Sequence, residues 1–142
     1  MSQENVEIVR RLFEAVARRD SEAVLSIYDR ALVWDHSHNT EIDRLMGGPT
    51  VYRGHQGLRQ WSRSFYDAWA SVDAELEEVI DAGDSVVVIL NYRGRGRVSG
   101  AEVQFARMGG VFTIERGKVV RVVWFRDRAE ALDFAGMRER EG

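Results

Sequence analysis

The sequence predicts an α+β fold in which three helices pack into the concave side of a strongly curved antiparallel sheet. In the first half of the chain, apolar residues recur at helical spacing, whereas after Trp69 the period changes to two. The segment Val119–Phe125 is apolar on both faces of the expected strand, which predicts a central strand covered on two sides. Such an arrangement encloses a cone-shaped cavity, the usual type of small-molecule site.

The length and composition restrict the class of protein. A chain of 142 residues predicts a single domain over residues 1–142. The formal net charge of -3 argues against nucleic acid as a partner, and the absence of cysteine excludes disulfides and thiol catalysis. No apolar run is long enough to span a membrane and the N-terminus lacks a signal-peptide core, so we expect a cytoplasmic protein with no membrane partner. No Walker loop or dinucleotide fingerprint is present, and no cofactor is expected.

Three helices are expected before the sheet. The first covers roughly Gln3–Ala17, and Asp20 caps a second, shorter helix that reaches Tyr28. A short strand, Ala31–Asp35, follows. The third helix, His55–Trp69, carries its large apolar residues on one face, namely Leu58, Trp61, Phe65 and Trp69.

The segment His36–Gly54 is the least regular part of the sequence. The run Gly47-Gly48-Pro49 breaks any helix there. A loop of this length in a small domain is either a binding loop or a mobile surface insertion, and the sequence gives the two interpretations equal weight.

Four long antiparallel strands are expected after the helices. Glu115–Lys118 has the composition of a tight turn, with Gly117 free to take positive φ. Gly109-Gly110 predicts a bend or bulge. The run Arg93–Arg97 alternates arginine with glycine, and we interpret it as sheet with water-facing arginines rather than an RNA-binding tract. The four strands are Val72–Ile80, Ser85–Tyr92, Ala101–Met108 continued after the bend by Val111–Ile114, and Val119–Phe125.

The last strand determines which side chains face the cavity, because side chains alternate along a strand. The residues expected on its inner face are Val120, Val122 and Trp124. Those expected on its outer face are Val119, Val123 and Phe125. We expect no element of the chain to cover the outer set, which therefore predicts a homodimer interface. A short helix follows, with Asp127 as its N-cap and Gly136 at its end.

Segments along nearly the whole chain resemble SnoaL-like proteins of the nuclear transport factor 2-like superfamily. They are NVEIVRRLFEAVARRDSEAVLSIYD, VYRGHQGLRQW, IDAGDSVVVI, FTIERGKVVRVVWF and DRAEALDFAG, in the family's order. The resemblance implies a cone-shaped, curved antiparallel sheet packed on three N-terminal helices, with a short C-terminal helix. It implies no single activity, because the superfamily includes polyketide cyclases, ketosteroid isomerases, epoxide hydrolases, dehydratases and non-catalytic binding modules.

The resemblance to ketosteroid isomerases implies a role for Asp35, which occupies the place of their carboxylate base. Phe13 stands in place of their helical tyrosine donor, and Gly109-Gly110 in place of their protonated aspartate. Loss of one such donor costs roughly 100- to 1,000-fold in rate. Steroid isomerisation of the usual type is therefore not expected.

Asp35 and His36 are the predicted catalytic residues. Asp35 follows the apolar run Ala31–Trp34, and burial in a cavity would raise its pKa toward a general-base value. The alternative is an exposed carboxylate at the start of the loop.

The histidines are weak evidence for a metal. His36 and His38, with Glu41 or Asp43, have a spacing that metal sites use, but His-x-His alone is common and no metal is expected. His55 is expected to have a structural role.

The predicted ligand is a flat, hydrophobic small molecule with one or two oxygens. Its pocket is expected to be lined by Phe13, Trp34, Tyr52, Trp61, Trp69, Tyr92, Arg107, Val120, Val122 and Trp124. The candidate donors to an anionic intermediate are Tyr92, Arg107, His36 and a backbone amide.

Two hypotheses for the function follow. The first is a cofactor-independent cyclase- or isomerase-type enzyme acting on a hydrophobic cyclic or polyketide-like substrate. The second is a non-catalytic module that binds a ligand or a partner protein. A buried Asp35 facing a donor favours the first hypothesis, whereas a pocket filled by Trp61 and Trp124, with Asp35 in water, favours the second.

Overall fold

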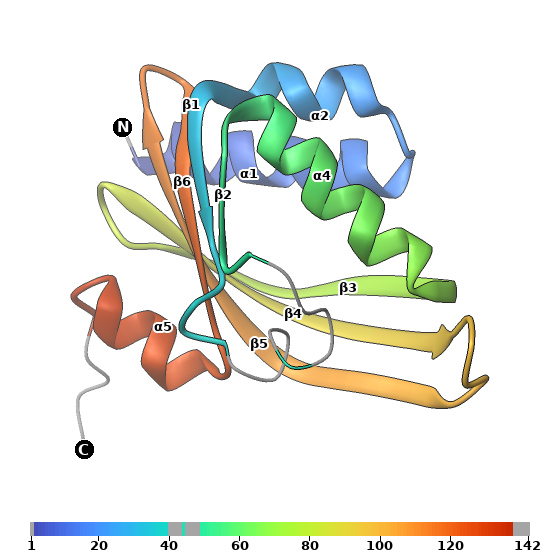
Figure 1. Ribbon diagram of the computed structural model, residues 1–142. Helices are drawn as coiled ribbons and strands as arrows, with labels where there is room; N and C mark the ends of the chain where they lie inside the picture. The colour runs from blue at the N-terminus through green and yellow to red at the C-terminus, as the bar shows by residue number, and fades with distance from the viewer. Residues whose placement is uncertain (1, 40–43, 45–48, 138–142) are drawn as a thin grey trace.

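The computed structural model describes residues 2–39, 44 and 49–137, and in it a six-stranded sheet separates two helical layers of unequal size (Figure 1). The strand order is β2-β1-β6-β5-β4-β3. Helices α1, α2 and α4 lie on one face of the sheet and α5 on the other (Figure 1). The elements are α1 (Ser2–Ala17), α2 (Ser21–Ile27), β1 (Tyr28–Asp35), β2 (Val51–Arg53), α4 (Gly54–Asp67), β3 (Trp69–Asp81), β4 (Ser85–Gly96), β5 (Glu102–Glu115), β6 (Lys118–Phe125) and α5 (Arg128–Phe134).

The end of α1 is closed by a hydrogen-bond pattern that usually requires glycine. The N–H of Arg19 donates to the carbonyl of Val16 and the N–H of Asp20 to that of Ala15, both at 3.0 Å. This pattern places Arg19 in the left-handed region, at φ 57°. Asp20 then caps α2, as expected, by accepting a hydrogen bond from the N–H of Ala23 at 3.2 Å.

The first strand is longer than expected, and it brings in an unexpected neighbour. Tyr28 begins β1 instead of ending the second helix. The short strand β2, inside the segment predicted to be irregular, pairs antiparallel with β1, and β1 itself pairs parallel with β6. The sheet is therefore mixed at this edge. Much of the rest of that segment, Glu41 and Asp43 included, lies outside the described residues.

Trp69 belongs to β3, although its spacing placed it on the helical stripe. Arg97 holds this junction: its N–H donates to the carbonyl of Ala68, and its guanidinium donates to the carbonyls of Asp67 and Trp69 at 3.0 and 2.8 Å. These bonds satisfy carbonyls at the end of α4, and the chain can leave the helix there. Arg93, Arg95 and Arg97 are exposed, in agreement with the sheet interpretation of this run.

The bulge expected at Gly109-Gly110 lies elsewhere. Strand β5 runs unbroken through both glycines, and its irregularity against β4 falls at Arg107, whose φ is 55°. The absence of a side chain at each glycine lets other residues pack close to the strand, Trp124 on the inner face and α5 on the outer face. A Cβ on Gly110 would lie 2.5 Å from the Trp124 ring, and one on Gly109 would lie 2.6 Å from the Cβ of Ala131 in α5.

Strand β6 is central, as predicted, but its inner face is not the predicted set. The register against β5 shifts between Thr113 and Ile114, which leaves Val120 as an extra residue. Because one extra residue reverses the alternation, Val119 joins Val122 and Trp124 in the main core. Val120 is only half-buried and packs in neither cluster, so its assignment to the inner face was wrong.

The outer face of β6 is covered by the chain itself. Val123 and Phe125 pack with Ala131 and Leu132 of α5 in a second cluster that also holds Val87, Ile89 and Val111. The helix begins as expected, with the Asp127 carboxylate accepting from the N–H of Glu130 at 2.9 Å. The surface chosen for a homodimer interface was therefore wrong, and dimerisation itself stays a prediction.

No helix in the described part of the chain is both long and apolar enough to cross a membrane.

Candidate functional site

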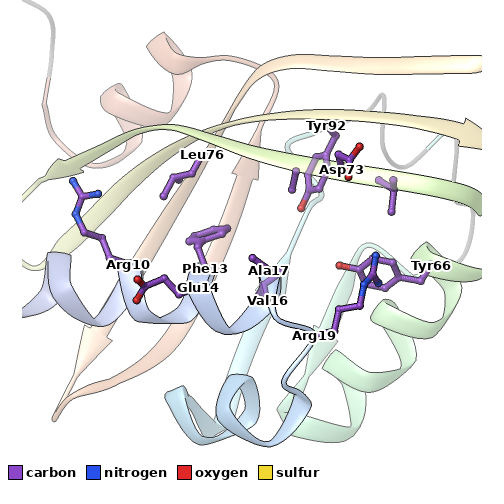
Figure 2. A pocket seen from close by; sticks show the side chains of 12 residues that line it. Arg10, Phe13, Glu14, Val16, Ala17, Arg19, Tyr66, Asp73, Leu76 and Tyr92 are labelled. Carbon is purple, nitrogen blue, oxygen red and sulfur yellow. The ribbon is translucent and has the colours of Figure 1, made fainter.

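A hollow of about 470 Å³ lies between the second half of α1, the end of α4 and the inner face of β3 and β4 (Figure 2). Its apolar walls come from Phe13, Val16, Ala17, Val72, Ala74 and Leu76. The remaining lining residues are polar or charged: Arg10, Glu14, Arg19, Tyr66, Asp73 and Tyr92. We call this hollow the α1–β3 pocket. Its volume falls within the range that small-molecule sites occupy.

Two tyrosines bring hydroxyl groups to the α1–β3 pocket. Figure 2 shows Tyr92 directed from β4 toward α1, and the Tyr66 hydroxyl directed from α4 toward the same space. Burial raises the pKa of Tyr92 above its ordinary value of 10.0, and the neighbouring Tyr66 phenol adds to the shift. Tyr92 therefore keeps its proton at neutral pH and can donate a hydrogen bond to a ligand oxygen.

Behind the pocket, aromatic rings fill the interior of the cone. Trp124 lies 5.6 Å from Trp34, Trp34 lies 4.7 Å from Trp61, and Trp61 stacks on Phe65 at 4.8 Å between ring centroids. Phe65 in turn lies 5.5 Å from Tyr92. The row connects the closed end of the cone with the α1–β3 pocket. Of the predicted lining residues, only Phe13 and Tyr92 border this pocket.

The other predicted lining residues occupy the core or the outer surface. Trp34, Tyr52, Trp61, Trp69, Val122 and Trp124 are buried in the main cluster. The indole N–H groups of Trp34, Trp61, Trp69 and Trp124 have no hydrogen-bond partner among the described residues. Buried donors of this kind are unusual and are available to an acceptor that enters the core.

Arg107 lies on the outer face of the sheet, so its predicted place in the pocket was wrong. Its N–H donates to the Asn91 side chain at 2.8 Å, and its guanidinium lies 3.8 Å from Glu77 and 3.4 Å from Glu78. The bulge at Arg107 turns the residue out of the alternation that its neighbours follow.

Asp35 forms its hydrogen bonds within its own loop and does not line the α1–β3 pocket. Its Oδ1 accepts from the N–H of Ser37 at 2.8 Å and from the Ser37 hydroxyl at 2.6 Å. Burial alone would raise the pKa of Asp35, but these two hydrogen bonds, with His38 and Arg121 nearby, lower it below its ordinary value of 3.8. The expected rise in pKa is therefore not found. The carboxylates that line the α1–β3 pocket are Glu14 and Asp73.

The three histidines have separate surroundings. His36 is buried with its ring 5.8 Å from that of Tyr52, whereas His38 is exposed and lies 5.0 Å from the Phe125 ring. The Nε2 of His55 is 2.8 Å from the carbonyl oxygen of Tyr28, which fits its expected structural role. Among the described residues, no group of three potential ligands could hold a metal ion.

Sequence reasoning missed Arg10, Arg19 and Tyr66 as pocket residues. The spacing of the apolar residues predicted the buried faces of α1 and α4. Arg10, Arg19 and Tyr66 lie next to these faces and not on them, so the spacing did not identify them. A signal existed for Arg19, because the helix expected to end at Ala17 is followed by no glycine before Asp20. An arginine then has to occupy the left-handed position.

The sequence and the structure of this chain are similar to those of known proteins. The model of the SnoaL-like domain matches residues 9–122. A similar solved structure is that of an NTF2-like protein of unknown function from Burkholderia pseudomallei, with 25% identity and a TM-score of 0.73, covering 92% of this chain and 95% of that one. No curated protein gives a significant match.

Two further structures share the fold at 20% identity. TerC, co-crystallised with polyporic acid, has a TM-score of 0.73 over 94% of this chain and 97% of its own. A putative SnoaL-like polyketide cyclase from Jannaschia sp. has a TM-score of 0.70 over 87% and 85%. Because the family model covers most of the sequence, this chain belongs to the SnoaL-like family of the nuclear transport factor 2-like fold.

Proposed function

We propose that the chain binds a hydrophobic small molecule in the α1–β3 pocket. The observation that carries the proposal is the hollow between Phe13 of α1 and Leu76 of β3, which has apolar walls and two tyrosine hydroxyls at one end. Apolar walls supply affinity through buried area, and a small number of polar groups fixes orientation. A flat molecule with one or two oxygens suits this combination.

Binding is tested with phenylnaphthylamine, a neutral apolar probe whose fluorescence rises when it leaves water. We expect one site per chain, and we expect Leu76→Trp to weaken binding by at least about tenfold because the larger ring fills the hollow. The stability of this variant should change little, since the ring enters empty space. Val98→Trp is the matched control, because Val98 is fully exposed and lines neither of the hollows described for this chain. Equal binding by both variants would contradict the proposed site.

A cyclase- or isomerase-type reaction on a hydrophobic cyclic or polyketide-like substrate is the second candidate. The observation in its favour is Tyr92, a protonated donor that faces the pocket. In this hypothesis Tyr92 replaces the two donors of ketosteroid isomerases, in whose places Phe13 and Gly109-Gly110 stand. The general base predicted from the sequence is Asp35, with His36 beside it. Neither residue lines the α1–β3 pocket, so a base within the pocket would be Glu14 or Asp73.

The assignment of the base is tested by Asp35→Asn on a substrate that the protein turns over. A fall in turnover by orders of magnitude with unchanged affinity assigns the base to Asp35. Unchanged turnover excludes Asp35 and moves the test to Glu14 and Asp73, the carboxylates that line the pocket.

A further inference from the structure

We propose that the end of the α1–β3 pocket formed by Arg19, Tyr66 and Tyr92 binds an anionic oxygen group, so that the ligand is a hydrophobic carboxylate. The inference rests on the proposed function and adds the charge of the ligand to it. Four observations support it: the place of Arg19 between two hollows, the cations around it, its backbone conformation and the donors beside it.

Arg19 stands at the boundary of two hollows. The second hollow, of about 460 Å³, lies between α2 and α4, and it shares Val16, Arg19 and Tyr66 with the α1–β3 pocket. The guanidinium carbon of Arg19 lies 5.8 Å from the centroid of the Tyr66 ring, and Figure 2 shows the two side chains together at the end of the pocket. A group bound at Arg19 is therefore within reach of a ligand body in either hollow.

Positive charge gathers around this boundary. Arg59 and Arg63 line the second hollow with Arg19, and that hollow has no lining carboxylate. None of these three arginines forms an ion pair with a carboxylate of the described residues. The protein as a whole carries a formal charge of -3, and the α1–β3 pocket has two lining carboxylates, Glu14 and Asp73, so the hollow whose charged lining residues are all cations is the second one. Such a cluster attracts an anion.

The backbone conformation of Arg19 indicates that its side chain has a function. Arg19 occupies the left-handed position after α1, where glycine is the residue with no steric cost. Strained positions held by a residue other than glycine cluster at functional sites. Of the three such residues in the described part of the chain, Arg19, Arg107 and Arg116, Arg19 is the one that lines a hollow described here. The cation–π contact with the exposed ring of Tyr66 contributes little energy and does not offset the cost of the left-handed conformation.

The neighbouring donors complete a recognition site for a carboxylate. The hydroxyls of Tyr66 and Tyr92 face the pocket from α4 and β4. A carboxylate has two oxygens and accepts charge-assisted hydrogen bonds from a guanidinium and from neutral hydroxyls. The apolar remainder of the ligand then lies against Phe13, Val72 and Leu76.

The test compares naphthylacetate with naphthylacetamide, which have the same ring and nearly the same shape but differ in charge. Calorimetric titration of the wild-type protein is expected to give tighter binding of the carboxylate. Arg19→Gln should reduce carboxylate affinity about three- to tenfold and leave amide affinity unchanged. Arg18→Gln is the matched control, because it removes the same charge from the adjacent residue, which lines neither hollow. We expect this control to change neither affinity by more than about twofold.

A second variant separates ligand recognition from a structural role. Arg19→Gly is expected to raise the melting temperature by about 1–3 °C, because glycine relieves the left-handed conformation, and to abolish the preference for the carboxylate. A fall in melting temperature would show that Arg19 serves the fold, and this would overturn the inference.

The remaining outcomes distinguish the two proposals. Equal affinity of the wild-type protein for both probes, or an equal loss of both in Arg19→Gln, would overturn the carboxylate inference and leave hydrophobic binding intact. Binding of neither probe, together with no binding of phenylnaphthylamine, would overturn both.

Discussion

The two faces of the sheet are both covered by apolar side chains, and the α1–β3 pocket lies on the inner face. On the outer face, small aliphatic residues such as Val87 and Val123 fit against the seven-residue helix α5, and they are almost completely buried. On the inner face, large rings fill the closed end of the cone, and α1 stands away from β3 at the open end. An apolar strand face thus predicts burial, whereas the shape of the element that covers it decides whether space remains.

The largest effect is expected from Phe125→Glu, on the outer face. Phe125 is buried beneath α5 near His38 and Phe134, so the variant replaces a packed ring with a carboxylate in an apolar cluster. We expect a loss of about 4 kcal/mol or more in the free energy of unfolding, measured by urea denaturation. Phe134→Glu is the control, because Phe134 is 42% exposed, and it should cost below about 1 kcal/mol. A stable Phe125→Glu variant that changes only from dimer to monomer in light scattering would restore the interface predicted from the sequence.

Alanine substitutions at Gly109 and Gly110 of β5 test how tightly each face of the sheet is packed. Gly110→Ala places a methyl group against the Trp124 ring, which is held by Trp34 and Phe112, and should cost about 1–3 kcal/mol. Gly109→Ala meets Ala131 and the carbonyl of Asp127, and α5 can shift away from the sheet. We therefore expect a smaller loss of stability and faster hydrogen exchange confined to α5. Equal losses with exchange unchanged in α5 would show that the outer cover is as rigid as the inner core.

The smallest effect is expected from Asp35→Asn. The pKa of Asp35 is lowered in the folded protein, so the ionised carboxylate stabilises the fold above its unfolded pKa, and this contribution disappears as the pH falls through the lowered folded pKa. The variant should be slightly less stable than the wild type at pH 7, because asparagine still accepts from the N–H of Ser37. The difference should vanish in acid. A constant difference down to the most acidic conditions in which the protein remains folded would contradict the assigned ionisation.

Local features of the fold could be predicted from the sequence, and long-range features could not. The caps at Asp20 and Asp127 depend on neighbouring residues and were found correctly. Val120 was predicted on the inner face of β6, but Val119 lies there. The cause is a shift in the pairing of β6 with Thr113 and Ile114 of β5, and the sequence of β6 alone does not encode this shift. The parallel pairing of β1 with β6 joins segments far apart in the chain.

The candidate site was predicted less well than the fold. Phe13 and Tyr92 were found because they lie on regular stripes that face the interior. Arg107 was lost because a bulge turns it outward. The low pKa of Asp35 depends on Ser37, only two residues away, and the Asp-x-Ser pattern was a usable signal for that turn.

The edge position of β3 also bears on whether strands of other molecules can pair with this sheet. Its thirteen residues lie at one end of the strand order, where the backbone pairs with a strand on one side only among the residues that the structure describes. A long free edge of this kind can recruit strands from other molecules and start aggregation. Strand β3 carries Asp73, Glu75, Glu77, Glu78 and Asp81 and no lysine or arginine. Glu77 and Glu78 pair with Arg107 and Arg128 within the chain. Repulsion between Asp73 and Glu75 of two copies that approach edge to edge would oppose strand addition at this edge.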